Sequence, residues 1–261
     1  MNVGQARVEV RERGVAELID LALRFTCAFG GRLYLRLFLV TALPAWGICW
    51  WALSGDDPDV ASVWALALSL FALVQVPFTI AASRLMFAEA PSLREVLAAS
   101  GKALWRSILT AMAGALLLTA GGMTIVFAPA ALARCLYVSE ITLLEGTGVS
   151  ASFSRSARFI RGRIWHAMVV WAALAVIALA FIVTVEIVAS ALTHDVLGLD
   201  MLEHVWEAYD SPAALFGFFV SLPFVTSARF LAYIDGRTRR EAWDVQVRFL
   251  KLGLDEQAKA A

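Results

Sequence analysis

The chain has 261 residues, of which 60% are hydrophobic and only 17% are charged. A soluble domain is typically about 45–50% apolar and about 25% charged, so this composition excludes an ordinary water-soluble domain and predicts an all-α integral membrane protein. The 22 basic and 22 acidic residues cancel, so the position of the charges carries more information than their sum.

Six apolar segments are long enough to be membrane spans, because the hydrocarbon layer of about 30 Å takes about 20 residues as helix. We expect these transmembrane helices at 33–53, 61–87, 105–121, 123–144, 164–188 and 212–234. The turn between the third and the fourth is only Gly121 and Gly122. A re-entrant hairpin over 105–144 is therefore the alternative to two full spans.

The distribution of charge predicts the orientation in the membrane. The loops 54–62 and 193–212 contain acidic residues and neither Lys nor Arg. The basic residues lie in the terminal segments, in the connections near 84–106 and 155–163, or just inside the ends of spans. Short loops rich in Lys and Arg stay in the cytoplasm. Both termini are therefore expected to be cytoplasmic, and an even number of spans follows, which favours six over five.

Three segments share a pattern of proline, arginine and acid: "VPFTIAASRLMFAE" (76–89), "VFAPAALARCLYVSE" (126–140) and "LPFVTSARFLAYID" (222–235). The prolines are Pro77, Pro129 and Pro223, the arginines are Arg84, Arg134 and Arg229, and the acids are Glu89, Glu140 and Asp235. We interpret these segments as the second helices of three hairpins. Each proline removes a backbone hydrogen bond and is expected to kink its helix.

A shorter amphipathic stretch precedes each hairpin, in "GVAELIDLALRF", "SLREVLAASGKALW" and "GVSASFSRSARFIRGRIW". Apolar residues at helical spacing beside Arg and Lys are typical of a helix in the headgroup layer. The predicted fold is one membrane domain of three parallel hairpin repeats, each preceded by an interfacial helix. The repeats cover 14–89, 91–145 and 147–236, and a cytoplasmic amphipathic tail follows at 237–261.

The arginines inside the spans are the candidate functional residues, because a charge at the bilayer centre costs at least about 2.5–3.5 kcal/mol. Arg84 and Arg229 are expected to reach the cytoplasmic interface. For Arg134 we expect a structural pair with Glu140 or with the acid of a neighbouring hairpin. A polar pathway and contact with lipid headgroups are the alternatives. The candidate intramembrane polar or lipid-contact residues are Arg84, Arg134, Arg229, Glu89, Glu140 and Asp235.

Catalytic, cofactor and metal signatures are not found in the sequence. No nucleophile elbow or phosphate loop occurs, and Cys27, Cys49 and Cys135 lack the spacing of a disulfide framework or a zinc site. The second acidic loop offers one alternative, a metal site at His194, Glu203, His204 and Glu207. We interpret that loop instead as an acidic amphipathic helix, and we expect no enzyme activity, cofactor or metal.

Three stretches carry a family resemblance: "GVAELIDLALRFTCAFGGRLYLRLFLVTALP" (14–44), "LLEGTGVSASFSRSARFIRGRIW" (143–165) and "YIDGRTRREAWDV" (233–245). They resemble the bacterial glycerophosphoryl diester phosphodiesterase membrane-domain family. The last matches its Y-x-D-x-R-x-R-x-E-x-x-D pattern at Tyr233, Asp235, Arg237, Arg239, Glu241 and Asp244. The family often has Gly where Ala242 stands.

The resemblance implies a free-standing six-helix protein of the bacterial cytoplasmic (inner) membrane with an uncharacterised function. It implies no phosphodiesterase activity, because such an enzyme needs a soluble barrel of roughly 250 residues with a metal at its mouth, and this chain consists of membrane spans. The family name is therefore no guide to an activity here.

The basic tail and the spans together lead to two functional hypotheses. The stretch 237–252 mixes arginines with acids and places Trp243, Val247 and Leu250 on one face. This pattern favours anionic headgroups of the cytoplasmic leaflet, or a membrane or cytoplasmic protein partner, over nucleic acid. The first hypothesis is a non-enzymatic scaffold or subunit of a membrane complex. The second is a small transporter or lipid-handling protein with a polar lining at Arg84, Arg134 and Arg229, and a membrane-bound enzyme is third.

Overall fold

The computed structural model describes all residues except 1–12, 56, 88–89, 124–126, 193–210 and 242–261. Every regular element among the described residues is a helix, as the all-α class requires. Five helical segments are long and apolar enough to cross a membrane: Val15–Leu53, Val60–Met86, Leu93–Gly122, Ile164–Ala191 and Pro212–Arg240. Each coincides with one of the six predicted spans, and the predicted span 123–144 is the exception.

The predicted first interfacial helix and first span form one helical run of 39 residues instead of two separate helices. Gly31 has a φ of +25°, which L side chains rarely adopt, so it permits a break in the regular helix at this point. The run consists of α1 (Val15–Phe25), the π-helical turn η2 (Thr26–Gly30), α2 (Gly31–Leu37), the π-helical turn η3 (Phe38–Ala42) and α3 (Leu43–Leu53).

The three prolines of the repeat occupy different helical positions. Pro77 lies inside α4 (Val60–Met86), where a proline removes one backbone hydrogen bond. Pro129 lies in the first turn of α6 (Ala128–Leu144), and Pro223 is the second residue of α11 (Leu222–Glu241). First-turn N–H groups have no acceptor within their helix, so proline costs little there. The expected kink at Pro129 is therefore wrong, because this proline begins α6. Pro223 lies directly after the break at Ser221 in the helical run Pro212–Arg240, where α11 begins.

The second repeat also differs from the prediction. α5 (Leu93–Gly122) is a single helix of 30 residues, so its amphipathic start and its apolar part are continuous. The hydroxyl of Ser92 caps this helix by accepting the N–H of Glu95 at 3.3 Å. α6 has 17 residues, which is about 26 Å at the rise of an α-helix. Its short length separates it from the five helices that can cross a membrane.

Only in the third repeat is the amphipathic helix a separate element. α7 (Val149–Ile160) ends just before Gly162, whose φ of +76° allows the chain to turn into α8 (Ile164–Ala191). The second acidic loop lies outside the described residues. The chain then returns through α10 (Pro212–Val220) and continues into α11.

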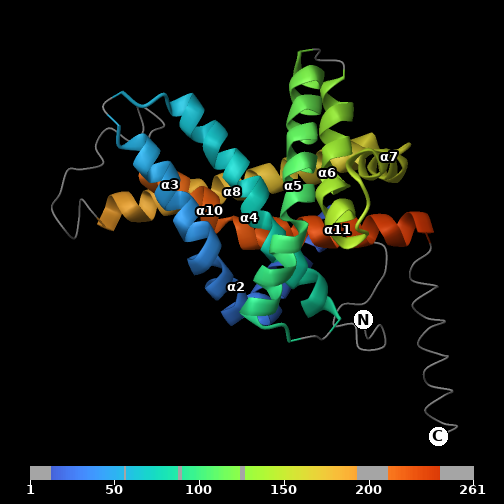
Figure 1. Ribbon diagram of the computed structural model, residues 1–261, viewed down its shortest axis with the longest axis horizontal. Coiled ribbons are helices and arrows are strands. Elements are labelled where there is room, and N and C mark those ends of the chain that lie inside the picture. Colours follow the sequence, from blue (N-terminus) through green and yellow to red (C-terminus); the bar gives the residue numbers. More distant parts are fainter. Residues whose placement is uncertain (1–12, 56, 88–89, 124–126, 193–210, 242–261) are drawn as a thin grey trace, which may run out of the picture.

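The helices form pairs that diverge from a common base (Figure 1). α5 and α6 lie side by side and point toward the top of the view, whereas α8 and α10 run toward the left, with α3 and α4 between these two pairs. α11 crosses the base, where it contacts α1, α4, α6 and α8. The largest fully buried side chains include Tyr233, Phe78, Phe219, Phe230 and Leu136. α11 is thus the central helix of the fold.

Burial differs strongly among the apolar helices. In the most apolar stretch of α5, and likewise of α8, only 11% of the residues are buried, against 83% of the corresponding stretch in Pro212–Arg240. Large apolar side chains on these two helices are exposed, among them Leu116, Val176 and Leu179. An apolar surface of this extent is typical of contact with lipid or with another membrane helix.

Gly217 on α10 lets this helix approach α8 closely. A Cβ atom at this position would lie 2.8 Å from the Cα atom of Ile182 and 2.9 Å from the carbonyl oxygen of Phe181. These are backbone atoms, so we expect Gly217→Ala to push the helices apart and to lower the free energy of unfolding by about 1–3 kcal/mol. Thermal unfolding in detergent micelles measures this change.

Gly47→Ala on α3 is the matched control, because nothing lies within 4 Å of the position of its Cβ atom. That substitution should be neutral or stabilising, since Ala favours a helix over Gly by about 1 kcal/mol. An equal loss of stability in both variants would contradict the close approach of α10 and α8.

Candidate functional site: a buried polar network at the centre of the helices

Arg229 lies in the middle of α11, and only 7% of its surface is exposed. Its Nε atom lies 3.1 Å from Oε1 of Glu140, and its Nη2 atom donates a hydrogen bond to Oε2 of the same carboxylate at 3.2 Å. Nη2 also donates to the carbonyl oxygen of Leu136 at 3.0 Å, and Nη1 donates to the side-chain oxygen of Gln75 at 2.8 Å. Each nitrogen of the guanidinium group therefore faces an acceptor, which suits its planar arrangement of donors.

Trp171 on α8 completes the surroundings of this arginine. The ring of Trp171 lies 5.7 Å from the guanidinium carbon of Arg229, within the range of a cation–π contact. Its indole N–H donates to the carbonyl oxygen of Leu132 on α6 at 2.8 Å, which fixes the ring. We call Arg229, Glu140, Gln75 and Trp171 the central polar network. Its members come from α11, α6, α4 and α8.

The electrostatics of the network follow from its burial. Glu140 has no exposed surface, and an isolated carboxylate in such surroundings would lose several kcal/mol of hydration energy. The guanidinium group of Arg229 supplies the opposite charge in direct contact, and Gln75 supplies a neutral acceptor on the opposite side. Each charge thus depends on the other, and their contact holds α11 against α6.

The predicted pair between Arg134 and Glu140 is wrong, because Glu140 pairs with Arg229. The reason is helical geometry: a residue six positions further on lies about 240° around an α-helix and about 9 Å along it. An arginine and the acid of the same repeat therefore face different sides of their helix. The pair forms between repeats, joining the arginine of the third to the acid of the second.

The expectation that Arg229 reaches the interface is also wrong, because its side chain is buried and contacts Glu140, Gln75 and Leu136 inside the protein. Arg84 does lie near the end of α4, where its Nη1 atom is 3.5 Å from Oε2 of Glu95 at the start of α5. Both side chains of that pair are accessible to solvent, so it contributes little stability. Glu89 lies outside the described residues.

Arg134 takes a third position. Its side chain is exposed and lines an open groove of about 460 Å³ between α5, α6 and α7, beside Leu117 and Phe153. Arg229 and Arg84 do not line this groove. The three arginines of the sequence pattern therefore have three different environments, namely an internal ion pair, a surface ion pair and an open groove.

The first part of the tail motif connects α11 to α7. The hydroxyl of Tyr233 donates to Oε1 of Glu145 at 2.8 Å, and Glu145 forms an ion pair with Arg155. The guanidinium carbon of Arg155 lies 5.4 Å from the ring centre of Phe159, and Arg237 lies over the ring of Tyr233 at 6.0 Å. Tyr233 is thus a structural link between the end of α6, α7 and α11.

Asp235 and Arg239 bind the segment before α1. One oxygen of Asp235 accepts the backbone N–H of Arg13 at 2.8 Å, and the other accepts Nε–H of Arg239 at 2.7 Å. Arg239 also donates to the carbonyl oxygen of Arg13. This clamp joins two parts of the chain that are more than 220 residues apart. The side chain of Glu241 and all of Asp244 lie outside the described residues.

The described part of the chain contains no group of three or more His, Cys, Asp or Glu side chains that could hold a metal ion. The alternative metal site at His194, Glu203, His204 and Glu207 lies in 193–210, outside the described residues. The polar groups of the central network contact one another, and the charge of Arg229 is offset by the charge of Glu140.

The five long apolar helices define an α-helical, multi-pass integral membrane protein. Comparison with family models, with curated proteins and with solved structures finds no match to the chain. The resemblance based on the tail motif therefore stays a prediction.

Two members of the network, Gln75 and Trp171, were not predicted from the sequence. The signal for Gln75 is present, because it is an isolated amide in the apolar run of α4, two residues before Pro77. A buried amide needs a hydrogen-bond partner, so its position marks a polar contact inside the protein. Trp171 carries no comparable signal, since a tryptophan in an apolar helix is common.

The buried ion pair makes a prediction that separates charge pairing from packing. Glu140→Leu or Arg229→Met alone leaves one charge buried and unpaired, so each should lower the free energy of unfolding by about 3–5 kcal/mol. The double variant should be markedly more stable than the sum of the two losses implies, because replacing a whole buried pair by apolar residues is often neutral. Thermal unfolding of the four proteins in one detergent measures the coupling.

Arg84→Met combined with Glu95→Leu is the control, because this pair is accessible to solvent and should contribute at most about 1 kcal/mol. Strictly additive losses at Arg229 and Glu140 would contradict the central pair.

Proposed function

We propose that the chain is a non-enzymatic scaffold or a subunit of a membrane complex. The observation that carries this proposal is the central polar network, in which the buried arginine forms an ion pair with Glu140 and donates hydrogen bonds to Gln75 and Leu136 of the same chain. A residue that moves a substrate needs free donors or acceptors, whereas these groups hold helices together. The network supports a structural task for the polar residues at the centre.

The exposed faces of α5 and α8 supply the surface for such a task. Both helices are apolar and almost unburied within the chain. Exposed side chains on α8 include Val176, Leu179 and Ile187. In a membrane these faces meet lipid or another helix, and a partner helix would contact a long uninterrupted apolar surface.

The alternative function is a small transporter or lipid-handling protein. The groove beside Arg134 favours it, because an exposed arginine at the edge of an apolar groove suits an anionic headgroup. The separate environments of Arg84 and Arg229 argue against a shared polar lining. The scaffold is therefore the better supported of the two.

The location and topology belong to the same proposal. A bacterial cytoplasmic membrane protein with six spans and both termini in the cytoplasm agrees with the acidic loops and the basic tail. α6 would be the sixth span, and its 17 residues also fit the re-entrant alternative. Membership in the glycerophosphoryl diester phosphodiesterase membrane-domain family is proposed on the stretches 14–44, 143–165 and 233–245, of which the last is the most specific.

Photo-cross-linking in native membranes tests the scaffold. A photoreactive amino acid in place of Val176, which is 65% exposed, should give a discrete cross-linked protein, because that face would contact a partner helix. The matched control replaces Leu174 on the same helix, which is 2% exposed and should give no intermolecular product. The readout is a mass shift on a denaturing gel. If Val176, Leu179 and Leu116 all give lipid adducts only, the scaffold proposal fails.

Cysteine labelling tests the transporter alternative. In a background without the three native cysteines, Thr79→Cys and Thr226→Cys place thiols at buried positions beside the network, with 0% and 1% exposure. A membrane-impermeant thiol reagent should leave both unlabelled in sealed vesicles of either orientation, because no hydrated pathway reaches them. Ser54→Cys, at an exposed helix end, should label from the external side only. Labelling at position 79 or 226 would favour transport, and labelling of position 54 from the cytoplasmic side would contradict the topology.

A further inference from the structure

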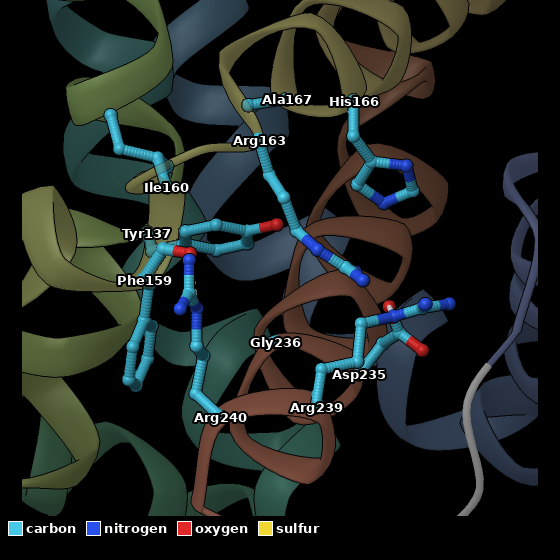
Figure 2. A pocket seen from close by; sticks show the side chains of 10 residues that line it. All are labelled: Tyr137, Phe159, Ile160, Arg163, His166, Ala167, Asp235, Gly236, Arg239 and Arg240. Carbon is cyan, nitrogen blue, oxygen red and sulfur yellow. Dashed lines mark hydrogen bonds and ion pairs between the residues drawn. The ribbon is translucent and has the colours of Figure 1, made fainter.

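A small cavity lies where the start of α8 meets the end of α11 (Figure 2). Arg163, just before α8, and His166 in its first turn reach toward it, and Arg239 and Arg240 reach toward it from α11. The cavity also borders Asp235. Its volume is about 20 Å³, which is enough for one water-sized group.

The cavity carries a net positive charge. Three of its lining residues are arginines, against one carboxylate. That carboxylate, Asp235, already accepts the N–H of Arg13 and the guanidinium of Arg239. Arg163 is exposed and makes no ion pair with any residue that the structure describes. The cavity therefore differs from the central polar network, whose charges balance within the chain.

We infer that this cavity is a binding site for a phosphoryl group, either in an anionic lipid headgroup or as free phosphate. The guanidinium group of Arg163 offers paired donors in the geometry that phosphate oxygens accept. The small volume admits one or two unesterified oxygens and leaves the rest of the group in the mouth. A terminal phosphate, as in phosphatidic acid, fits such a cavity better than a diester with a bulky headgroup.

Two neighbouring features agree with a phosphoryl ligand. Arg240 donates to the carbonyl oxygens of Phe159 and Arg161 at the end of α7, so its position at the edge of the cavity is fixed by the chain itself. Trp165 is 80% exposed beside the cavity at the start of α8, as is typical of a residue at the membrane–water interface. A site at this level is within reach of headgroups and of ions in solution.

Binding to the purified full-length protein in phosphatidylcholine nanodiscs tests the inference. Calorimetric titration with inorganic phosphate measures the free ion, and native mass spectrometry of nanodiscs containing phosphatidic acid or phosphatidylglycerol measures the lipid. Arg163→Gln should weaken the binding of the effective probe at least tenfold, which corresponds to about 1.4 kcal/mol. Arg163→Lys should retain part of the affinity, because it keeps the charge and loses the planar pair of donors.

Arg161→Gln is the matched control: its side chain is exposed, lies two positions away and does not line the cavity. Unchanged affinity in this variant, together with loss in Arg163→Gln, supports the site. Binding of the lipid without binding of inorganic phosphate assigns the site to a lipid headgroup. Binding of inorganic phosphate without retention of the lipid assigns the site to the free ion. If neither phosphate nor lipid binds, the inference is overturned. It is also overturned if Arg163→Gln and Arg161→Gln lose the same affinity, because that result would indicate a general attraction to a basic surface. Neither result depends on the scaffold proposal.

Discussion

The ion pair between Arg229 and Glu140 is the constraint on which the arrangement of the helices depends. A buried charge is tolerated only where an opposite charge and further hydrogen bonds replace its water. Here the replacements come from three other helices, through Glu140, Gln75 and Trp171. α11 therefore fits in one register only, because a shift along or around its axis would remove the arginine from these partners.

The register of α11 also determines which contacts the side chains at its end can make. Asp235 lies six residues beyond Arg229 and so faces a different side of the helix. There it binds the backbone of Arg13 and the side chain of Arg239, while Tyr233 turns toward Glu145. α11 thus connects four parts of the protein: the segment before α1, the end of α6, α7, and the ion pair between Arg229 and Glu140. These contacts account for Tyr233, Asp235 and Arg239 of the tail motif.

The sequence predicted which segments form long apolar helices better than it predicted the contacts between those helices. Five predicted spans coincide with long apolar helices, because hydrophobic length is a local property. The partner of Glu140 depends on which sides of two distant helices face each other, and a linear pattern of proline, arginine and acid does not contain that information. A linear pattern also does not show where a helix begins. Pro129 precedes Arg134 as a proline precedes the arginine in the other two repeats, but α6 begins at Ala128, so this proline lies in the first turn and does not bend the helix.

The arginines of this chain perform two kinds of task, and charge balance distinguishes them. In the central network the positive charge of Arg229 meets a carboxylate of the same chain, and the whole group is removed from solvent. Around the small cavity the only carboxylate, Asp235, is already satisfied, so the charge of Arg163 has no internal counterpart among the described residues. The exposed charge of Arg163 takes no part in the contacts that hold the buried helices together. An exposed arginine without an internal counterpart is instead the arrangement that an external anion would neutralise.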